Sequence, residues 1–306
     1  MAKSFPSGVF TVLVTPFNPD ETIDYFSLRR WFDLQANSSV AGLVIMGTTS
    51  ESCTIKPREQ IKILSTIKTW NVLLPKPKYI VFGVGGNDTN KMLKLANKVV
   101  ELCDAFMVTV PSYNKPTQTG IYEHFKKICS DKLLGTHPVI MYNVPARTGV
   151  NMEVSTISSI FNDFPNVVAI KEASGSIPQL IQIRSQVPNL KVFAGDDLLL
   201  LDFMTHGACG VISVASNIIP KIICEIYSDC VDSSCTNKWE KFYKLKLPEL
   251  INGLFCESNP IPIKYLLFST KIFTHNVLRL PMTSLDVKYH SKIENSLENT
   301  LKVYGK

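Results

Sequence analysis

"VVAIKEASGS", residues 167–176, is a short apolar run that ends in a lysine. The residues from Val167 to Ile170 predict a strand buried on both faces, as in a parallel sheet. Lys171 lies where this strand should end, and a Gly-Ser pair marks the turn that follows. A lysine in this position most often extends its ammonium group into solvent. The alternative is an amine held in a dry pocket, where burial disfavours the charged form and the nitrogen can attack a carbonyl carbon.

The same strand-like pattern recurs along the chain and alternates with helical patterns eight times. The helical segments carry apolar residues three and four positions apart, and one begins at Pro57, a favourable first helical residue. Eight such units in about 230 residues predict an α/β fold of the TIM type, a (β/α)8 barrel. The predicted strands are Val9–Thr15, Gly42–Met46, Tyr79–Gly83, Ala105–Val110, Pro138–Tyr142, Val167–Lys171, Lys191–Gly195 and Gly210–Ser213.

A doubly wound parallel sheet is the main alternative for such alternation. That fold usually carries a glycine-rich phosphate loop after its first strand, whereas the first predicted strand here leads into VTPFNPDET. The run GVGGN at 83–87 lacks the G-x-G-x-x-G spacing, so it predicts a tight turn rather than a cofactor site. After residue 230 the alternation stops and helical segments follow. We therefore expect a barrel over residues 1–230 and a C-terminal helical region packed on it over residues 231–306.

The composition is that of a globular protein, with 45% hydrophobic residues. The net charge of +6 comes from 32 basic and 26 acidic residues that are dispersed, so neither a nucleic-acid nor a membrane partner is favoured. The N-terminal residues lack the apolar core of a secretory signal, and we expect a cytoplasmic protein. The eight cysteines form no C-x-x-C pair and the five histidines no ligand-spaced pair, so we expect no metal site and no disulfide framework.

In a barrel of this type, the residues at the carboxyl ends of the strands form the active site. Each polar group found there also has an ordinary structural explanation, such as a Ser/Thr turn, a core aromatic residue or a surface charge. Taken together, however, these groups would surround one mouth. They are Thr48 and Thr49 after the second strand, Tyr113 after the fourth, Tyr142 and Arg147 at the fifth, Lys171 at the sixth and Gly195 at the seventh.

These groups suit the chemistry of a Schiff base. An amine such as that of Lys171 condenses with a keto group to give an iminium ion, and loss of a proton then gives an enamine, which is a carbon nucleophile. Tyr142, one strand away, shuttles protons if hydroxyl partners such as Thr48 and Tyr113 support it. Arg147 presents a planar guanidinium group to a carboxylate. The sequence therefore predicts a Schiff-base aldolase or synthase that acts on small keto acids.

The motifs GTTSES, YNVPARTG, IKEASG, AGDD, GVISV and NPIPIK occur in this order across residues 47–264. On these motifs the chain resembles the dihydrodipicolinate synthase branch of the pyruvate-dependent class I aldolases. The resemblance implies condensation of pyruvate with aspartate semialdehyde to 4-hydroxy-tetrahydrodipicolinate, a step of lysine and diaminopimelate biosynthesis. It also implies a homotetramer built as a dimer of dimers, and no cofactor.

Two groups of site residues follow from the resemblance. The catalytic group would be Lys171, which carries the Schiff base, and a proton relay of Tyr142, Thr48 and Tyr113. Tyr113 would reach into the site of a neighbouring subunit. The second group would hold the carboxylates of the substrates, and it comprises Thr49, Gly195 and the Ile212 carbonyl for pyruvate and Arg147 for the second substrate.

Two other functions stay open at this point. A sister aldolase would cleave a longer keto acid such as N-acetylneuraminate or 2-keto-3-deoxygluconate. Members of the N-acetylneuraminate lyase branch typically lack an arginine in the turn after the tyrosine, so Arg147 favours the synthase. A barrel without catalytic activity would serve as a binding scaffold, and the complete set of lysine, tyrosine and threonine argues against it.

Several positions depart from the family pattern. The family motif GTTGES reads GTTSES here, and Ser50 would be strained if the family glycine requires a positive φ. Lysine-inhibited relatives carry histidine and glutamate residues at a dimer-interface site. The matching positions here are Pro57, Gln60 and Lys91, and a loop tyrosine is replaced by Ser112.

We expect that free lysine does not inhibit this protein, because the ammonium group of Lys91 would repel the ammonium group of a bound lysine. Turnover measured with increasing concentrations of lysine should stay constant. Half-inhibition at sub-millimolar lysine would refute this prediction.

Overall fold

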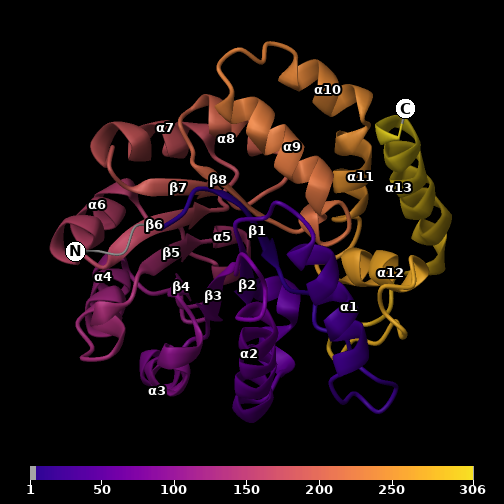
Figure 1. Cartoon of the computed structure of the whole chain (residues 1–306). Coiled ribbons are helices and arrows are strands. Elements are labelled where there is room, and N and C mark those ends of the chain that lie inside the picture. The colour runs from indigo at the N-terminus through magenta and orange to yellow at the C-terminus, as the bar shows by residue number, and fades with distance from the viewer. Residues whose placement is uncertain (1–4, 306) are drawn as a thin grey trace.

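The computed structural model describes residues 5–305 and contains the predicted barrel. Eight parallel strands pair in sequence order, and the eighth pairs with the first to close the sheet (Figure 1). The predicted (β/α)8 architecture is therefore confirmed. The strands are β1 (Gly8–Val12), β2 (Gly42–Ile45), β3 (Tyr79–Val84), β4 (Ala105–Thr109), β5 (Val139–Asn143), β6 (Val167–Glu172), β7 (Lys191–Ala194) and β8 (Gly210–Ser213).

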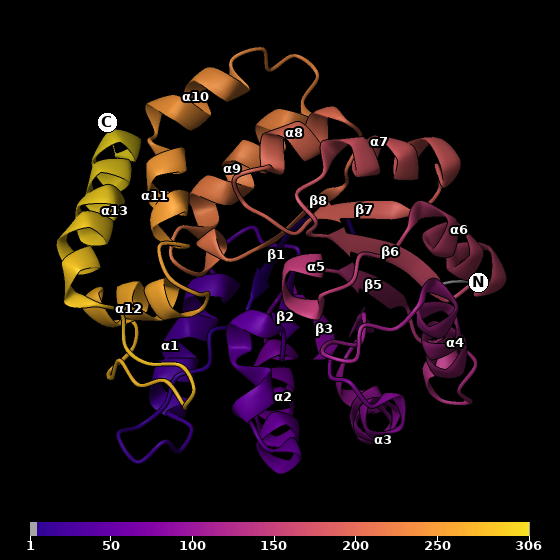
Figure 2. The same cartoon turned by 180° about the vertical axis from the view of Figure 1, so that it is seen from behind.

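Helices connect the strands and surround them, as Figures 1 and 2 show. Aspartate side chains cap two of them: Asp24 accepts hydrogen bonds from backbone N–H groups at the start of α1, and Asp88 does the same for α3. The helices that accompany the barrel are α1 (Tyr25–Ala36), α2 (Pro57–Asn71), α3 (Thr89–Val99), α4 (Gln118–Cys129), α5 (Pro145–Thr148), α6 (Val154–Asp163), α7 (Ile177–Gln186), α8 (Leu200–Thr205) and α9 (Pro220–Val231).

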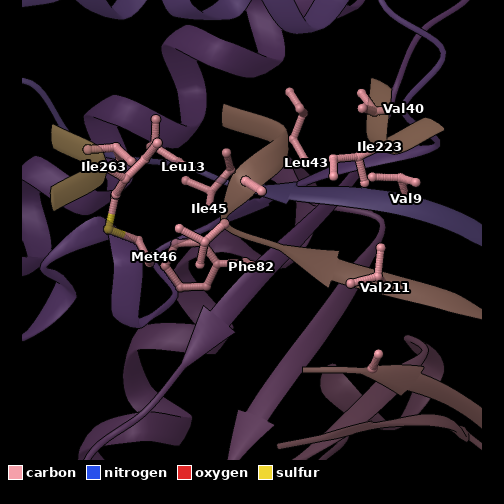
Figure 3. Packing of buried hydrophobic residues seen from close by; sticks show 14 of the residues in the cluster. Val9, Leu13, Val40, Leu43, Ile45, Met46, Phe82, Val211, Ile223 and Ile263 are labelled. Carbon is pink, nitrogen blue, oxygen red and sulfur yellow. The ribbon is translucent and has the colours of Figure 1, made fainter. Parts of the chain in front are cut away.

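The strands are buried on both faces, which explains their continuous apolar sequences. Side chains alternate along each strand, so one set fills the barrel and the other packs against the helices. Phe10 and Phe193 belong to the inner set, where their ring centroids lie 5.7 Å apart. Val9 and Leu43 belong to the outer set, part of which Figure 3 shows. The barrel is thus a packed core, and space for a ligand lies at its rim.

Closure of the barrel requires a glycine at the start of β8. Gly210 has a φ of +155°, and a Cβ atom at this position would lie 2.0 Å from the carbonyl oxygen of Gly8 on β1. Such a distance is far inside van der Waals contact, so the close approach of β1 and β8 excludes a side chain here.

Helices α10–α13 follow α9 and lie together beside the barrel, orange to yellow in Figure 1. Helix α13 packs against α11 and α12, and Leu250 and Ile293 are buried there. The predicted boundary at residue 230 falls in the last turn of α9. Residues 1–4 and 306, at the two ends of the predicted parts, lie outside the described residues. The division into two parts stays a prediction. The helices are α10 (Lys238–Lys244), α11 (Leu247–Gly253), α12 (Ile261–Ser269) and α13 (His290–Tyr304).

Among residues 5–305, no helix combines the length and the apolar character needed to cross a membrane.

Candidate active site

Lys171 and Tyr142 are buried side by side inside the barrel. They lie opposite each other in the pairing of β5 with β6, and they are 6% and 5% exposed. The Lys171 Nζ atom lies 4.4 Å from the centroid of the Tyr142 ring. The Lys171 amine therefore does not extend into solvent. Of the two interpretations drawn from the sequence, the structure agrees with the buried amine.

The next residue pair locks this register from the outer face of the sheet. Asn143 lies opposite Glu172, and its Nδ2 atom donates to both carboxylate oxygens at 3.2 and 3.0 Å. The same carboxylate accepts from Gln179 Nε2 at 3.0 Å and from one backbone N–H, so the buried charge is well solvated by donors. Because side chains alternate, this outward pair holds Tyr142 and Lys171 inward. Asn143 and Glu172 were not predicted from the sequence. A polar residue at the end of each apolar run could have indicated a buried polar pair.

The threonine turn follows β2 as a single turn of 3₁₀ helix, η1 (Thr48–Ser50). Thr49 is buried, and its Oγ1 accepts a hydrogen bond from Asn259 Nδ2 at 2.9 Å. Ser50 has a negative φ, so the strain considered from the sequence is absent. Its hydroxyl group donates to the Leu13 carbonyl oxygen at 2.7 Å, which fastens the turn to the residue after β1.

The residue after this turn, Glu51, has a positive φ of 55° and forms a buried ion pair with Lys264 of α12. Its other carboxylate oxygen accepts a hydrogen bond from the backbone N–H group of Arg279 at 3.1 Å. Lys264 also donates to the Val277 carbonyl oxygen at 3.0 Å and lies over the ring of Phe17. Burial lowers the pKa of the Lys264 amine, and the Glu51 carboxylate opposes that shift. This pair, which the sequence analysis did not find, ties the threonine turn to the C-terminal region.

A cavity of about 310 Å³ opens at the carboxyl ends of β2 to β5. Thr48, Arg147 and Asn259 line it, and Arg147 Nη2 donates to the Asn259 carbonyl oxygen at 3.2 Å. Lys171 and Tyr142 do not line the cavity. Thr109 does, and it lies opposite Tyr142 in the pairing of β4 with β5. The cavity therefore adjoins the buried lysine–tyrosine pair, and it offers cationic and hydroxyl groups to an acidic ligand.

The remaining predicted residues differ in their placement. The Gly195 N–H donates to the Glu172 carbonyl oxygen at 2.8 Å, and a Cβ atom here would lie 2.4 Å from that of Ala173, so this glycine permits close strand packing. Ile212 is buried inside the barrel on β8. Tyr113 has a φ of 69° and is 84% exposed, so the structure does not bring it to Lys171 of its own chain.

A larger, open groove of about 650 Å³ lies between the start of α3 and α4. Side chains of both charges line it, and the Lys91 ammonium lies 3.5 Å from the Asp88 carboxylate. It contains none of the predicted catalytic or substrate-binding residues, so size alone does not identify the reactive site.

Known proteins resemble this chain over nearly its whole length. The model of the Dihydrodipicolinate synthetase family matches residues 5–300. A 4-hydroxy-tetrahydrodipicolinate synthase from Azobacteroides pseudotrichonymphae genomovar. CFP2 is 38% identical over 292 residues, 95% of this chain and 96% of that protein. A crystal structure of dihydrodipicolinate synthase from Thermotoga maritima has a TM-score of 0.90 at 34% identity and covers 96% of this chain and 98% of that one. A monomeric dihydrodipicolinate synthase variant has the same TM-score and identity, with 96% and 97% covered.

We expect Lys264→Met to destabilise the protein strongly, by roughly 3–5 kcal/mol, because it leaves the Glu51 carboxylate buried without its cation. The double variant Glu51→Gln, Lys264→Met removes both charges and should regain much of this loss. Urea unfolding followed by circular dichroism measures both effects.

Lys126→Met is the matched control, because Lys126 pairs with Glu123 on the exposed surface of α4. Its effect should stay below about 1 kcal/mol. A cost for Lys264→Met no larger than that of the control would show that the buried pair does not hold the turn.

Proposed function

The chain belongs to the dihydrodipicolinate synthetase family, and on this premise we propose that it condenses pyruvate with aspartate semialdehyde through a Schiff base on Lys171. The product is 4-hydroxy-tetrahydrodipicolinate, which serves lysine and diaminopimelate biosynthesis. The observation that carries the assignment of Lys171 is its buried amine beside the buried phenol of Tyr142. The enzyme is a class I carbon–carbon lyase or synthase.

The reaction begins at the amine of Lys171. Its nitrogen attacks the keto carbon of pyruvate, and the keto oxygen takes up protons and leaves as water, which gives an iminium ion. The methyl group then loses a proton to form an enamine. The enamine carbon attacks the aldehyde carbon of the second substrate, and the aldehyde oxygen takes up a proton. The amino group of the second substrate finally replaces Lys171 at the iminium carbon, which closes the ring and frees the lysine.

Tyr142 moves the protons that these steps require. Its ring lies beside the Lys171 amine, where its hydroxyl group serves as acid and base in turn. Thr48 stands at the wall of the adjoining cavity, and we assign it to pass protons between Tyr142 and the mouth. Tyr113 completes the relay from a neighbouring subunit, because its own chain leaves its side chain in solvent.

The two carboxylate groups are held at separate places. Thr49 donates its hydroxyl group to the carboxylate of pyruvate, and the glycine at 195 and the Ile212 carbonyl border the same position. Arg147 receives the carboxylate of aspartate semialdehyde, because its planar guanidinium group fits two carboxylate oxygens. Arg147 also favours this reaction over cleavage of a sialic acid.

We assign the working assembly as a homotetramer built from two dimers, in which each Tyr113 enters the partner's site. The exposed tyrosine supports this arrangement. One structural neighbour is a monomeric variant, so the fold itself does not require assembly. The partners are small molecules rather than nucleic acid or membrane, and the compartment that suits this biosynthetic role is the cytoplasm.

We expect Lys171→Ala to abolish both the pyruvate adduct and turnover while the protein stays folded. Incubation with pyruvate and borohydride should add one reduced pyruvate to the wild-type peptide that contains Lys171, as read by mass spectrometry. Lys191→Ala, a change of a lysine on the neighbouring strand β7, should keep the adduct. A reduced adduct on another lysine in the Lys171→Ala variant would disprove the assignment.

We expect Tyr142→Phe to slow turnover by roughly 10²-fold or more, because it removes the hydroxyl group that moves protons. Tyr79→Phe is the control, since Tyr79 packs against the inner core and its hydroxyl group donates to a backbone carbonyl of Asp104. The control should turn over at a near-normal rate. A near-normal rate in Tyr142→Phe would remove Tyr142 from the relay.

A further inference from the structure

Thr109 brings a hydroxyl group to the cavity wall at the point where the cavity adjoins Tyr142. It is the last residue of β4, and it lies opposite Tyr142 in the pairing of β4 with β5. The four residues before it on the strand are buried, whereas Thr109 is partly exposed and lines the 310 Å³ cavity. Within residues 5–305, its hydroxyl group has no hydrogen-bond partner, and its oxygen atom keeps accessible surface.

The direction of the Thr109 side chain follows from the alternation along β4. Met107 belongs to the inner set of side chains, and Val108 belongs to the outer set. Thr109 therefore points inward, to the same side as Tyr142. Gly85, which also lines the cavity, supports this direction, because a Cβ atom there would lie 3.5 Å from Thr109 Oγ1. Since position 85 carries no side chain, space remains beside the hydroxyl group.

Two other threonines of the cavity wall use their hydroxyl hydrogens within the protein. Thr54 and Thr148 each donate to a backbone carbonyl oxygen, at 3.0 and 2.9 Å. The Thr109 hydroxyl group, in contrast, has a hydrogen to give to a ligand. Its place next to Tyr142 puts this donor at the end of the cavity where the carbon–carbon bond forms.

The reaction develops negative charge on one substrate oxygen at this end of the cavity. With its carboxylate on Arg147, the second substrate extends its aldehyde group toward the adduct on Lys171. The electron pair of the enamine forms the new carbon–carbon bond, and the π electrons of the aldehyde move to its oxygen, which Tyr142 then protonates. Two strand spacings, roughly 10 Å, separate the backbones of Thr109 and Lys171, which leaves room for the adduct between them. A hydrogen-bond donor placed there stabilises the charge as it develops.

We propose that the Thr109 hydroxyl group donates a hydrogen bond to the aldehyde oxygen of the second substrate and stabilises this oxygen while the carbon–carbon bond forms. The proposal rests on the proposed function and adds one donor to the residues that act on the second substrate. Tyr142 supplies the proton, and Thr109 holds the oxygen that receives it. Thr109 takes no part in the earlier reaction of pyruvate with Lys171, so its removal affects only the second half of the reaction.

The variant Thr109→Val tests this contact, because valine is similar in shape and keeps a β-branched side chain on the strand. In heavy water with pyruvate alone, proton NMR measures exchange of the pyruvate methyl hydrogens, which reports enamine formation. This rate should stay within about twofold of the wild-type rate. The single-turnover rate of pyruvate-loaded enzyme with aspartate semialdehyde should fall by roughly 10- to 100-fold, the value of a hydrogen bond to a charged group.

An unchanged single-turnover rate, or an equal loss in both rates of a folded variant, would overturn the proposal. Circular dichroism checks that the variant is folded, and Thr109→Ala takes its place if it is not. Thr109→Ser keeps the hydroxyl group and should retain the single-turnover rate within about threefold. A loss in Thr109→Ser as large as that in Thr109→Val would also overturn the proposal.

Ser112→Ala is the matched control. Ser112 carries a hydroxyl group in the same cavity wall, but it lies in the loop after β4 and not opposite Tyr142. This variant should leave both rates near normal. A loss of single turnover equal to that of Thr109→Val would overturn the specific role of Thr109. Absence of methyl exchange in wild type would instead overturn the proposed function itself.

Discussion

The lateral pairing of β5 with β6 is the constraint on which the site depends. Tyr142 and Lys171 face each other inside the barrel, and one residue later Asn143 and Glu172 face each other outside it. A slip of one residue in either strand would move every side chain to the opposite face. The Asn143–Glu172 hydrogen bonds would then be lost, so the polar pair outside the barrel also fixes the positions of Tyr142 and Lys171 inside it. The geometry of an amine and a phenol is thus set by sheet register rather than by a flexible loop.

Residues after the barrel contact the segments that follow strands β2 and β5. Asn259 contacts Thr49 and Arg147, and Lys264 pairs with Glu51 directly after the threonine turn. A residue with a positive φ, such as Glu51, costs free energy unless its surroundings hold it, and here a buried cation does so. The segment beyond the barrel therefore contacts three residues of the candidate site region, Thr49, Glu51 and Arg147. The candidate site is therefore built on contacts between segments that are distant in the sequence.

The sequence allowed the barrel to be predicted and candidate site residues to be chosen at the strand ends, because both follow from local patterns. Buried parallel strands read as apolar runs, and the residue that ends each run reaches the same rim. The first strand was predicted to extend to Thr15, whereas β1 ends at Val12, because burial of Leu13 and Val14 continues past the ladder. What failed were features that depend on tertiary contact. No local pattern pairs Lys264 with Glu51, and nothing in the motif GTTSES shows that Ser50 donates to Leu13.

The proposed function depends on a covalent bond between pyruvate and Lys171. The most direct measurement is a crystal structure of the wild-type protein soaked with pyruvate. The account predicts continuous electron density from Lys171 Nζ to the keto carbon, with the pyruvate carboxylate against Thr49 and the Tyr142 hydroxyl group within hydrogen-bond distance of the adduct. Pyruvate bound without a bond to Lys171, or joined to a different lysine, would contradict it.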